Sequence, residues 1–343
     1  MGQMNDRRKF IKTIASVGIG LSILNPGSLF GKTQPGQGKR IGIIGLDTSH
    51  SVAFTKEFNN PAAGPEMGGY RVVAAYPKGS EDIQSSLEVV PKYTEQIIAL
   101  EVEIVDSIEA LLEKSDVILL ETNDGRPHLK QAMPVLKAGK KMFIDKPMTA
   151  SLADAVAIFD EAERLKVPVF SCSALRFMES AQDIVNGKIG KVIGVSAYSP
   201  ATIEKTHPDF FWYGIHGVEV LFTLMGTGCK SVTRIHTPDT DLAVGLWEDN
   251  RIGTFRGIRS GRHDYGGFVY GEKGNATVGP FQGYKPLLLE IVKFFQTGKV
   301  PFNNRETLEI LAFMEAADES KRKGGIPVSM DKIWKKVKTK KNK

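Results

Sequence analysis

Short apolar runs alternate with amphipathic segments through the first half of the chain. Runs of this length predict buried strands, and apolar residues at helical spacing predict the helices between them. The expected strands are residues 41–44, 70–76, 116–122, 142–144 and 167–172. The expected helices are residues 52–58, 105–112, 128–138 and 152–165. Regular alternation of strand and helix predicts a parallel, doubly wound sheet.

The pattern changes after residue 177. Longer strand-like segments joined by short turns take over, which indicates an open, mostly antiparallel sheet. These strands are expected at residues 191–198, 231–236, 242–247, 252–256, 267–271 and 276–278. Helices are expected at residues 216–225, 287–295 and 305–321. The fold class is therefore α/β for the first half, followed by an α+β domain.

The N-terminal segment resembles an export signal. Arg7 and Arg8, followed by Lys9 and Phe10, precede a weakly apolar run at residues 13–24. Paired arginines in this position are typical of a twin-arginine signal, which predicts a periplasmic or exported protein. The run is too short and too rich in glycine and serine to form a stable transmembrane span. A basic amphipathic helix is the alternative, and no clear A-x-A site indicates removal of the segment.

The net charge of +6 comes from the two ends of the chain. Residues 1–35 contribute +4 and residues 332–343, with seven lysines, contribute +7, so that residues 36–331 carry −5. A nucleic-acid-binding protein carries its basic patch on the folded body, so the charge argues against that class. The lysine-rich tail, residues 331–343, is expected to be a solvated end. Cys172 and Cys229 are too few for a disulfide framework and are expected to be buried thiols.

Residues 40–58 form a strand, a tight turn and a helix, as at the start of a dinucleotide-binding fold. A G-x-G-x-x-G fingerprint would place glycines at 45, 47 and 50, but Asp47 and His50 replace the second and third. The second glycine lets a pyrophosphate approach the backbone, so Asp47 puts dinucleotide binding in question. Hydroxyl groups and the helix N-terminus still suit an anion. The candidate cofactor-binding residues of this turn are Gly45, Leu46, Asp47, Thr48, Ser49 and His50.

Further cofactor candidates follow the next strands. Lys78 and Ser80 stand where an acidic ribose ligand is expected, and they suit the 2′-phosphate of NADP better than the hydroxyl of NAD. An ordinary turn is the alternative for these two residues. The loop after residues 116–122 adds Thr122 and Asn123, and His128 begins the next helix.

The expected strand at 142–144 ends in Asp145, Lys146 and Pro147. Proline disfavours helical geometry in the residue before it, so Lys146 is expected to be extended. The carboxyl end of a parallel strand faces the crevice where α/β folds bind ligands. A solvated acid–base pair is the alternative for an isolated motif of this kind.

The chain resembles the Gfo/Idh/MocA oxidoreductases from about Arg40 to Val328. Four motifs that follow one another in family order carry the resemblance: Ala138-Gly139-Lys140 with Asp145-Lys146-Pro147, Arg176-Phe177 with Gly187-Lys188-Ile189-Gly190, Tyr213 to Gly226, and Gly271-Glu272-Lys273-Gly274. The resemblance implies a Rossmann-like nucleotide-binding domain at residues 36–173. It also implies an α+β substrate and oligomerisation domain at residues 174–330, and a homo-oligomer joined through the open sheet.

The resemblance also implies roles for individual residues. Lys146 would hold the substrate and contact the nicotinamide ribose, and His216 would be the acid/base, a task that suits imidazole. Arg176, Trp212 and Tyr213 are substrate-binding candidates. The alternatives are a helix-start histidine satisfied by the backbone for His216, an ion pair between domains for Arg176, and a core residue for Trp212.

Three departures from the family pattern concern the site. Two fingerprint glycines are missing, the usual Glu of the E-K-P motif is Asp145, and Trp212 replaces an Asp four residues before His216. A positioned carboxylate commonly tunes such a histidine, and this carboxylate is absent here. The aromatic group Phe210 to Tyr213 is either a sugar-stacking wall or core, with core favoured for Phe210 and Phe211.

Three functions remain open at this point. The first is an oxidoreductase that uses NAD or NADP on a sugar, cyclitol or glycoside. The second is NAD-dependent glycoside cleavage by oxidation, elimination and re-reduction. The third is a non-redox sugar-binding protein, which the broken fingerprint favours and the retained Lys146 and His216 oppose. The six histidines show no paired spacing typical of metal ligands, so no metal site is predicted.

Overall fold

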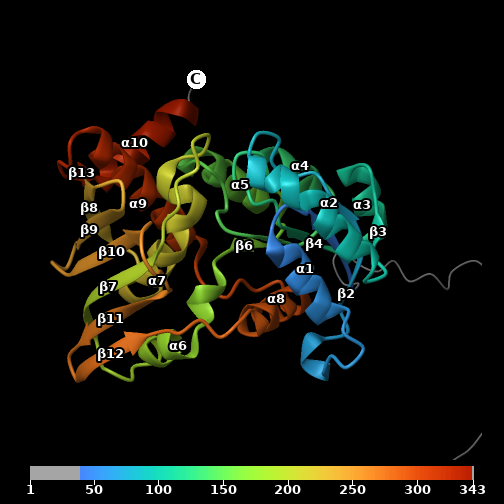
Figure 1. Cartoon of the computed structure of the whole chain (residues 1–343), viewed down its shortest axis with the longest axis horizontal. Coiled ribbons are helices and arrows are strands. Elements are labelled where there is room, and N and C mark those ends of the chain that lie inside the picture. The colour runs from blue at the N-terminus through green and yellow to red at the C-terminus, as the bar shows by residue number, and fades with distance from the viewer. Residues whose placement is uncertain (1–38, 342–343) are drawn as a thin grey trace, which may run out of the picture. The chain divides into compact units, whose positions relative to one another are not determined.

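The computed structural model describes residues 39–341 (Figure 1). The predicted export signal lies outside the described residues, so the export route stays a prediction. Among residues 39–341, no helix combines the length and the apolar character that crossing a bilayer requires.

A six-stranded parallel sheet forms the first half, in the order β3-β2-β1-β4-β5-β6. Its strands are β1 (Arg40–Ile44), β2 (Arg71–Tyr76), β3 (Glu103–Ile104), β4 (Val117–Leu120), β5 (Met142–Ile144) and β6 (Val169–Ser171). Its helices are α1 (Ser49–Phe58), α2 (Gln84–Ile98), α3 (Ile108–Lys114), α4 (His128–Lys137) and α5 (Leu152–Leu165). The strand order reverses between β1 and β4, which creates the crevice where such sheets bind ligands. The predicted doubly wound sheet is confirmed.

Both faces of this sheet are covered, which explains the continuous apolar strands. In β4, Ile118 and Leu120 enter the core under α3, α4 and α5, whereas Val117 and Leu119 enter the core under α1. Helix α8 (Lys285–Thr297) belongs to the second half of the sequence but packs into this second core, beside α1 (Figure 1). The boundary at residue 173 stays a prediction, although α8 crosses back over it.

A seven-stranded sheet forms the second half, in the order β12-β11-β7-β10-β9-β8-β13. Only β7 and β10 pair in parallel; all other neighbours are antiparallel, so the predicted mostly antiparallel sheet is confirmed. Its strands are β7 (Val192–Pro200), β8 (Cys229–His236), β9 (Thr240–Trp247), β10 (Ile252–Ile258), β11 (Gly266–Gly271), β12 (Gly274–Val278) and β13 (Val328–Ser329).

Among residues 39–341, helices cover one face of the second sheet and leave the other without a helix. α7 (Ile215–Met225) contacts β7 and β10, and α9 (Asn304–Arg322) contacts β8. The uncovered face carries exposed apolar side chains, namely Ile193, Tyr198, Ile235, Leu246, Ile252, Phe268 and Tyr270. The remaining elements are η1 (Pro65–Met67), η2 (Ala174–Phe177), α6 (Glu179–Val185), η3 (Phe210–Gly214) and α10 (Met330–Lys341).

Two segments differ from the sequence-based expectation. Helix α2 was not predicted; its apolar residues do recur at helical spacing, but Pro91 lies inside the pattern, and only Ser86 and Ile97 are buried. The tail was expected to be solvated, but α10 buries Ile333 and Val337 against the core. The expectation was wrong for this stretch of the tail because these apolar residues, four apart, form one helical face. Cys172 and Cys229 are free buried thiols, as predicted.

The close packing of α7 on β10 gives the first testable prediction. Gly217 lies against the ring of Phe255, and a methyl group at Gly217 would clash with that ring. Gly217→Ala should therefore lower the free energy of unfolding by about 1–3 kcal/mol, despite the better helix propensity of alanine. Urea unfolding measures the change. A double variant that also carries Phe255→Leu should recover stability. An unchanged free energy of unfolding in Gly217→Ala would contradict the close contact between Gly217 and Phe255.

Candidate functional site

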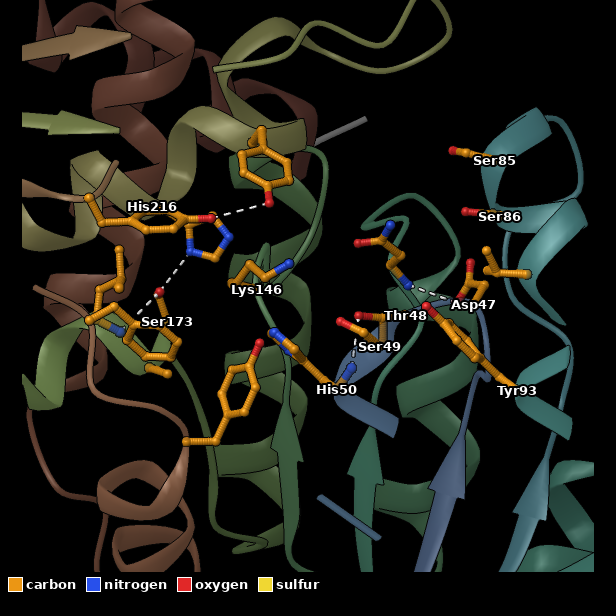
Figure 2. A pocket seen from close by; sticks show the side chains of 18 residues that line it. Asp47, Thr48, Ser49, His50, Ser85, Ser86, Tyr93, Lys146, Ser173 and His216 are labelled. Carbon is orange, nitrogen blue, oxygen red and sulfur yellow. Dashed lines mark hydrogen bonds between the residues drawn. The ribbon is translucent and has the colours of Figure 1, made fainter. Parts of the chain in front are cut away.

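A cavity of about 250 Å³ lies at the carboxyl ends of β1, β4 and β5, opposite α7 (Figure 2). The β1–α1 turn and the first half of α2 form one side of the cavity, and η2, η3 and α7 form the other. Lys146 lies between the two sides (Figure 2). The crevice predicted at this edge of the sheet is therefore a defined cavity.

Hydroxyl groups and helix N-termini converge on the first side. Gly45 has φ +90°, which makes the tight turn after β1. Thr48 caps α1, where its hydroxyl accepts the His50 N–H at 3.3 Å. Ser85 and Ser86 come from the first turn of α2, and both line the cavity together with Thr48 and Ser49. N–H groups at helix starts and hydroxyls form a donor set for an anionic group.

Asp47, at the second fingerprint position, ties three loops together. Its carboxylate accepts the Ser80 N–H and the Asn123 N–H, each at 2.9 Å. Burial raises the pKa of Asp47, while these two N–H groups act in the opposite direction. The carboxylate lies against Gly79, where any Cβ atom would overlap it. The added negative charge that the sequence predicted is thus held by backbone donors.

Lys78 and Ser80, the candidates for binding the 2′-phosphate of NADP, follow β2 and lie outside the first cavity. A second cavity of about 630 Å³ is lined by Lys78 and Ser80. The Ser80 hydroxyl donates to Asp124 at 3.1 Å, so it is not free to bind a 2′-phosphate. Lys78 is exposed and remains available.

Three other cofactor candidates lie behind the cavity wall. Leu46 is fully buried, and the buried Thr122 side chain lies against Gly45. Both ring nitrogens of His128 contact carbonyl oxygens, Met148 O at 2.9 Å and Thr122 O at 2.8 Å. These residues shape the loops, whereas Asn123 reaches the cavity.

Asp145 is fully buried beneath the cavity and contacts two basic side chains. Its Oδ2 lies 2.8 Å from His50 Nδ1 and 3.8 Å from Lys146 Nζ. Burial alone would raise the pKa of Asp145, but the charges of His50 and Lys146 lower it below its usual value. The carboxylate is therefore ionised. Within residues 39–341, Asp145 is the only ion-pair partner of Lys146, whose ammonium faces the cavity.

His216 approaches from the first turn of α7. Its Nδ1 lies 2.8 Å from Ser173 Oγ, and its ring stands edge-on between Tyr213 and Tyr265. Burial lowers the pKa of His216 well below its usual value, and the nearby charges of Lys146 and His50 lower it further. The imidazole is neutral at physiological pH. The two predicted catalytic residues, Lys146 and His216, thus line one cavity.

Sequence reasoning missed several cavity residues. Aromatic side chains form much of the wall, and their sequence positions lie in irregular segments without any period. Failure to predict α2 hid the residues of that helix, and Ser173 follows a strand without a motif. The missed residues are Ser85, Ser86, Val89, Tyr93, Ser173, Ala174, Leu175, Tyr265, Phe281 and Tyr284.

Arg176 and Trp212 do not line the cavity, contrary to the sequence-based interpretation. Arg176 is buried in an ion pair with Glu219, Nε to Oε1 at 2.6 Å, and in a second with Glu306. Two carboxylates therefore occupy the guanidinium that was expected to bind substrate. Trp212 is buried beside His207, while Tyr213, the next residue, does line the cavity. Phe210 and Phe211 are core residues, as favoured.

Glu121 is a buried acid close to His50 and Asp145. Neither of its carboxyl oxygens has a hydrogen-bond partner within residues 39–341, and Asp145 Oδ1 also lacks one. Burial, and then the charge of Asp145, raise the pKa of Glu121 well above its usual value. Ligand atoms of His50, Glu121 and Asp145 lie within 4.8 Å of one another, a spacing open to a metal ion. We assign no metal here, because Nδ1 already bonds Asp145 and the Lys146 ammonium adjoins it.

Comparisons with known proteins agree with this fold. Residues 39–172 match the family model GFO_IDH_MocA, "Oxidoreductase family, NAD-binding Rossmann fold". The uncharacterised oxidoreductase YhhX of Escherichia coli K12 is 24% identical over 190 residues, which are 49% of this chain and 54% of that protein. The match thus spans about half the length of this curated relative.

Solved structures match over most of the chain. A scyllo-inositol dehydrogenase from Lactobacillus casei, with bound NAD(H) and scyllo-inositol, is 17% identical with a TM-score of 0.67, over 85% of this chain and 99% of that one. A probable dehydrogenase from Thermotoga maritima is 18% identical with a TM-score of 0.68, over 86% and 99% of the two chains. At this identity the matches establish the two-domain fold.

The buried acid gives a prediction about stability and pH. Because the pKa of Glu121 is raised in the folded protein, the carboxyl keeps a proton that the unfolded chain loses as pH rises above the usual glutamate pKa of 4.5. Wild-type stability therefore falls as pH rises through this window, by up to about 1.4 kcal/mol per pH unit. Glu121→Gln removes this loss, so the variant should gain stability relative to wild type as pH rises.

Urea unfolding between about pH 5 and about pH 8 measures the difference in unfolding free energy. Glu113→Gln, which changes an exposed glutamate on α3, is the matched control. A difference between Glu121→Gln and wild type that does not change with pH would contradict the assignment of a protonated Glu121.

Proposed function

We propose that this chain is a Gfo/Idh/MocA-type oxidoreductase that transfers hydride between NAD or NADP and the hydroxyl-bearing carbon of a sugar, cyclitol or glycoside. The observation that carries the proposal is the placement of the Lys146 ammonium and the neutral His216 imidazole in one cavity at the switch point of the sheet. An inositol dehydrogenase with bound NAD(H) and inositol among the similar structures supports the substrate class.

The residues present fit a nicotinamide dinucleotide. Four hydroxyls at the starts of α1 and α2, those of Thr48, Ser49, Ser85 and Ser86, line the cavity and would hold its phosphates. Asn123 and Lys146 would contact the nicotinamide ribose. The first cavity is slightly smaller than the roughly 300–1,000 Å³ that drug-sized ligands fill, so the adenosine half needs the second cavity. The bound nicotinamide supplies the hydride acceptor or donor.

The side chains of the cavity hold the reacting hydroxyl. Lys146 donates to its oxygen and stabilises negative charge that develops there. Ser173 Oγ accepts the Leu175 N–H at 3.3 Å, and its own hydrogen can be donated to His216 Nδ1 at 2.8 Å. His216 Nε2 then carries the ring hydrogen and donates it to the oxygen of the hydroxyl. The aromatic wall of Tyr213 and its neighbours covers the apolar face of a ring and excludes water.

The choice between NAD and NADP rests on Lys78. Its exposed ammonium at the second cavity supports NADP, while Ser80 no longer contributes because Asp124 engages its hydroxyl. We keep NADP as the proposed preference on this single residue.

Assembly and location are proposals as well. The uncovered apolar face of the second sheet, with Ile235 and Ile252 more than half exposed, favours pairing with a second copy of the chain. Export through the twin-arginine route rests on Arg7 and Arg8 in the sequence.

Two alanine variants test the proposed function. Lys146→Ala and His216→Ala should each lower kcat/KM for polyol oxidation by at least about a hundredfold, because each removes a polar contact to the reacting hydroxyl. Steady-state assays of nicotinamide reduction with scyllo-inositol and related polyols measure this. Lys230→Ala, at an exposed position of β8, is the control. Near-normal kcat/KM in either variant would remove that residue from the site.

A further inference from the structure

Two departures from the family pattern contact each other in this fold. His50 replaces the third fingerprint glycine, and Asp145 is one methylene shorter than the usual glutamate. Their side chains meet at 2.8 Å, Nδ1 to Oδ2. The family-type histidine, His216, has meanwhile lost its carboxylate, because Trp212 stands four residues before it. The histidine–carboxylate pair of this cavity is therefore His50–Asp145.

The pairing fixes which nitrogen of His50 is free. An ionised carboxylate only accepts hydrogen bonds, so Nδ1 of His50 carries a hydrogen and donates it to Asp145. Nδ1 is the only ring nitrogen of His50 with a hydrogen-bond partner in the described stretch of the chain. Nε2 is left with its lone pair, on a side chain that lines the cavity (Figure 2). Stacking on Phe54 and edge contact with Tyr284 hold the ring in place.

Within the described part of the chain, His50 has a carboxylate partner, whereas His216 does not. Asp145 adjoins His50 directly and can stabilise the imidazolium that forms when Nε2 takes a proton, as in other histidine–carboxylate pairs. His216 has a hydroxyl partner, Ser173, and among residues 39–341 no carboxylate lies at hydrogen-bond distance from its ring. The titratable and charged groups that surround His50 are Asp145, Glu121, Lys146, His216 and Tyr284.

Asp145 supplies the charge balance. Its carboxylate contacts the Lys146 ammonium and also Nδ1 of His50, so it balances the positive charge that a proton on Nε2 brings. Lys146 Nζ contacts the same Asp145 oxygen as His50, so a hydroxyl bound by Lys146 lies next to this pair.

We infer that His50, oriented by Asp145, is the base that takes the hydroxyl proton of a polyol substrate, and that His216 positions this hydroxyl. The inference rests on the proposed function. The O–H bond breaks as the Nε2–H bond forms, the hydride leaves the same carbon for the nicotinamide, and the carbonyl forms. Asp145 keeps its charge throughout and is a positioning residue.

Kinetics of the full chain test the inference. His50→Gln should lower kcat at least about a hundredfold and remove the acid limb of the kcat/KM profile, with the dinucleotide Kd within about threefold of wild type. His216→Gln should lower kcat but keep the acid limb of the kcat/KM profile. His236→Gln is the matched control, because His236 Nδ1 bonds Asp241 at 2.7 Å in the same way but lies outside the cavity.

A measurement without substrate tests the geometry. Nitrogen NMR of ring-labelled histidine should show His50 with its hydrogen on Nδ1, and Asp145→Asn should release this preference. A hydrogen on Nε2 instead, a normal kcat in His50→Gln, or a bound metal whose removal shifts the His50 signals would each overturn the inference. Absence of dinucleotide binding by the wild-type chain would overturn the proposed function as well. Failure of the His50 inference alone would leave dinucleotide binding intact, so the two results can be told apart.

Discussion

The buried carboxylate of Asp145 fixes the positions of the two cavity side chains that it contacts, His50 and Lys146. It lies at the carboxyl end of β5, next to the end of β4 where Glu121 follows. Removing Asp145 would leave the buried Lys146 ammonium without its carboxylate, and loss of one partner of a buried ion pair typically costs about 3–5 kcal/mol. The placement of both cavity side chains therefore depends on this one carboxylate.

Asp47 has a comparable role at the end of β1. By accepting N–H groups from the loops after β2 and β4, it replaces a glycine of the dinucleotide fingerprint with a fixed link among three loops. The fingerprint is thus reorganised in a definite manner: Asp47 packs on Gly79, and His50 packs on Asp145. Each of these two departures from the pattern has a specific partner in the fold, which explains how the chain keeps the architecture with only Gly45 retained.

Much of the fold could be predicted because strand and helix periods are local signals. The segments of β1, β2, β4, β5, β6 and α5 follow directly from apolar runs and capping residues. Helix α2 was missed because Pro91, a residue that usually ends a helix, lies inside its apolar spacing. Helix α10 was hidden by its lysines, because the count of charges outweighed the spacing of Ile333 and Val337.

Site residues that directly follow a strand could be predicted. Site residues whose contacts depend on packing between distant segments could not. Lys146 and the β1–α1 turn follow from topology, and His216 followed from the family resemblance. Arg176 fails as a substrate ligand because Glu219 and Glu306, far away in sequence, neutralise it. The contact between His50 and Asp145 joins residues 95 positions apart, so no sequence window contains it.

The most direct test of the proposed redox function is the detection of a dinucleotide on the purified protein. The protein is precipitated, released NAD(H) or NADP(H) is identified by mass spectrometry, and added cofactor is titrated if none is released. We expect bound or titratable dinucleotide, held against the starts of α1 and α2. Failure to bind either cofactor would contradict the proposed function and would leave a sugar-binding protein that keeps the fold without the redox chemistry.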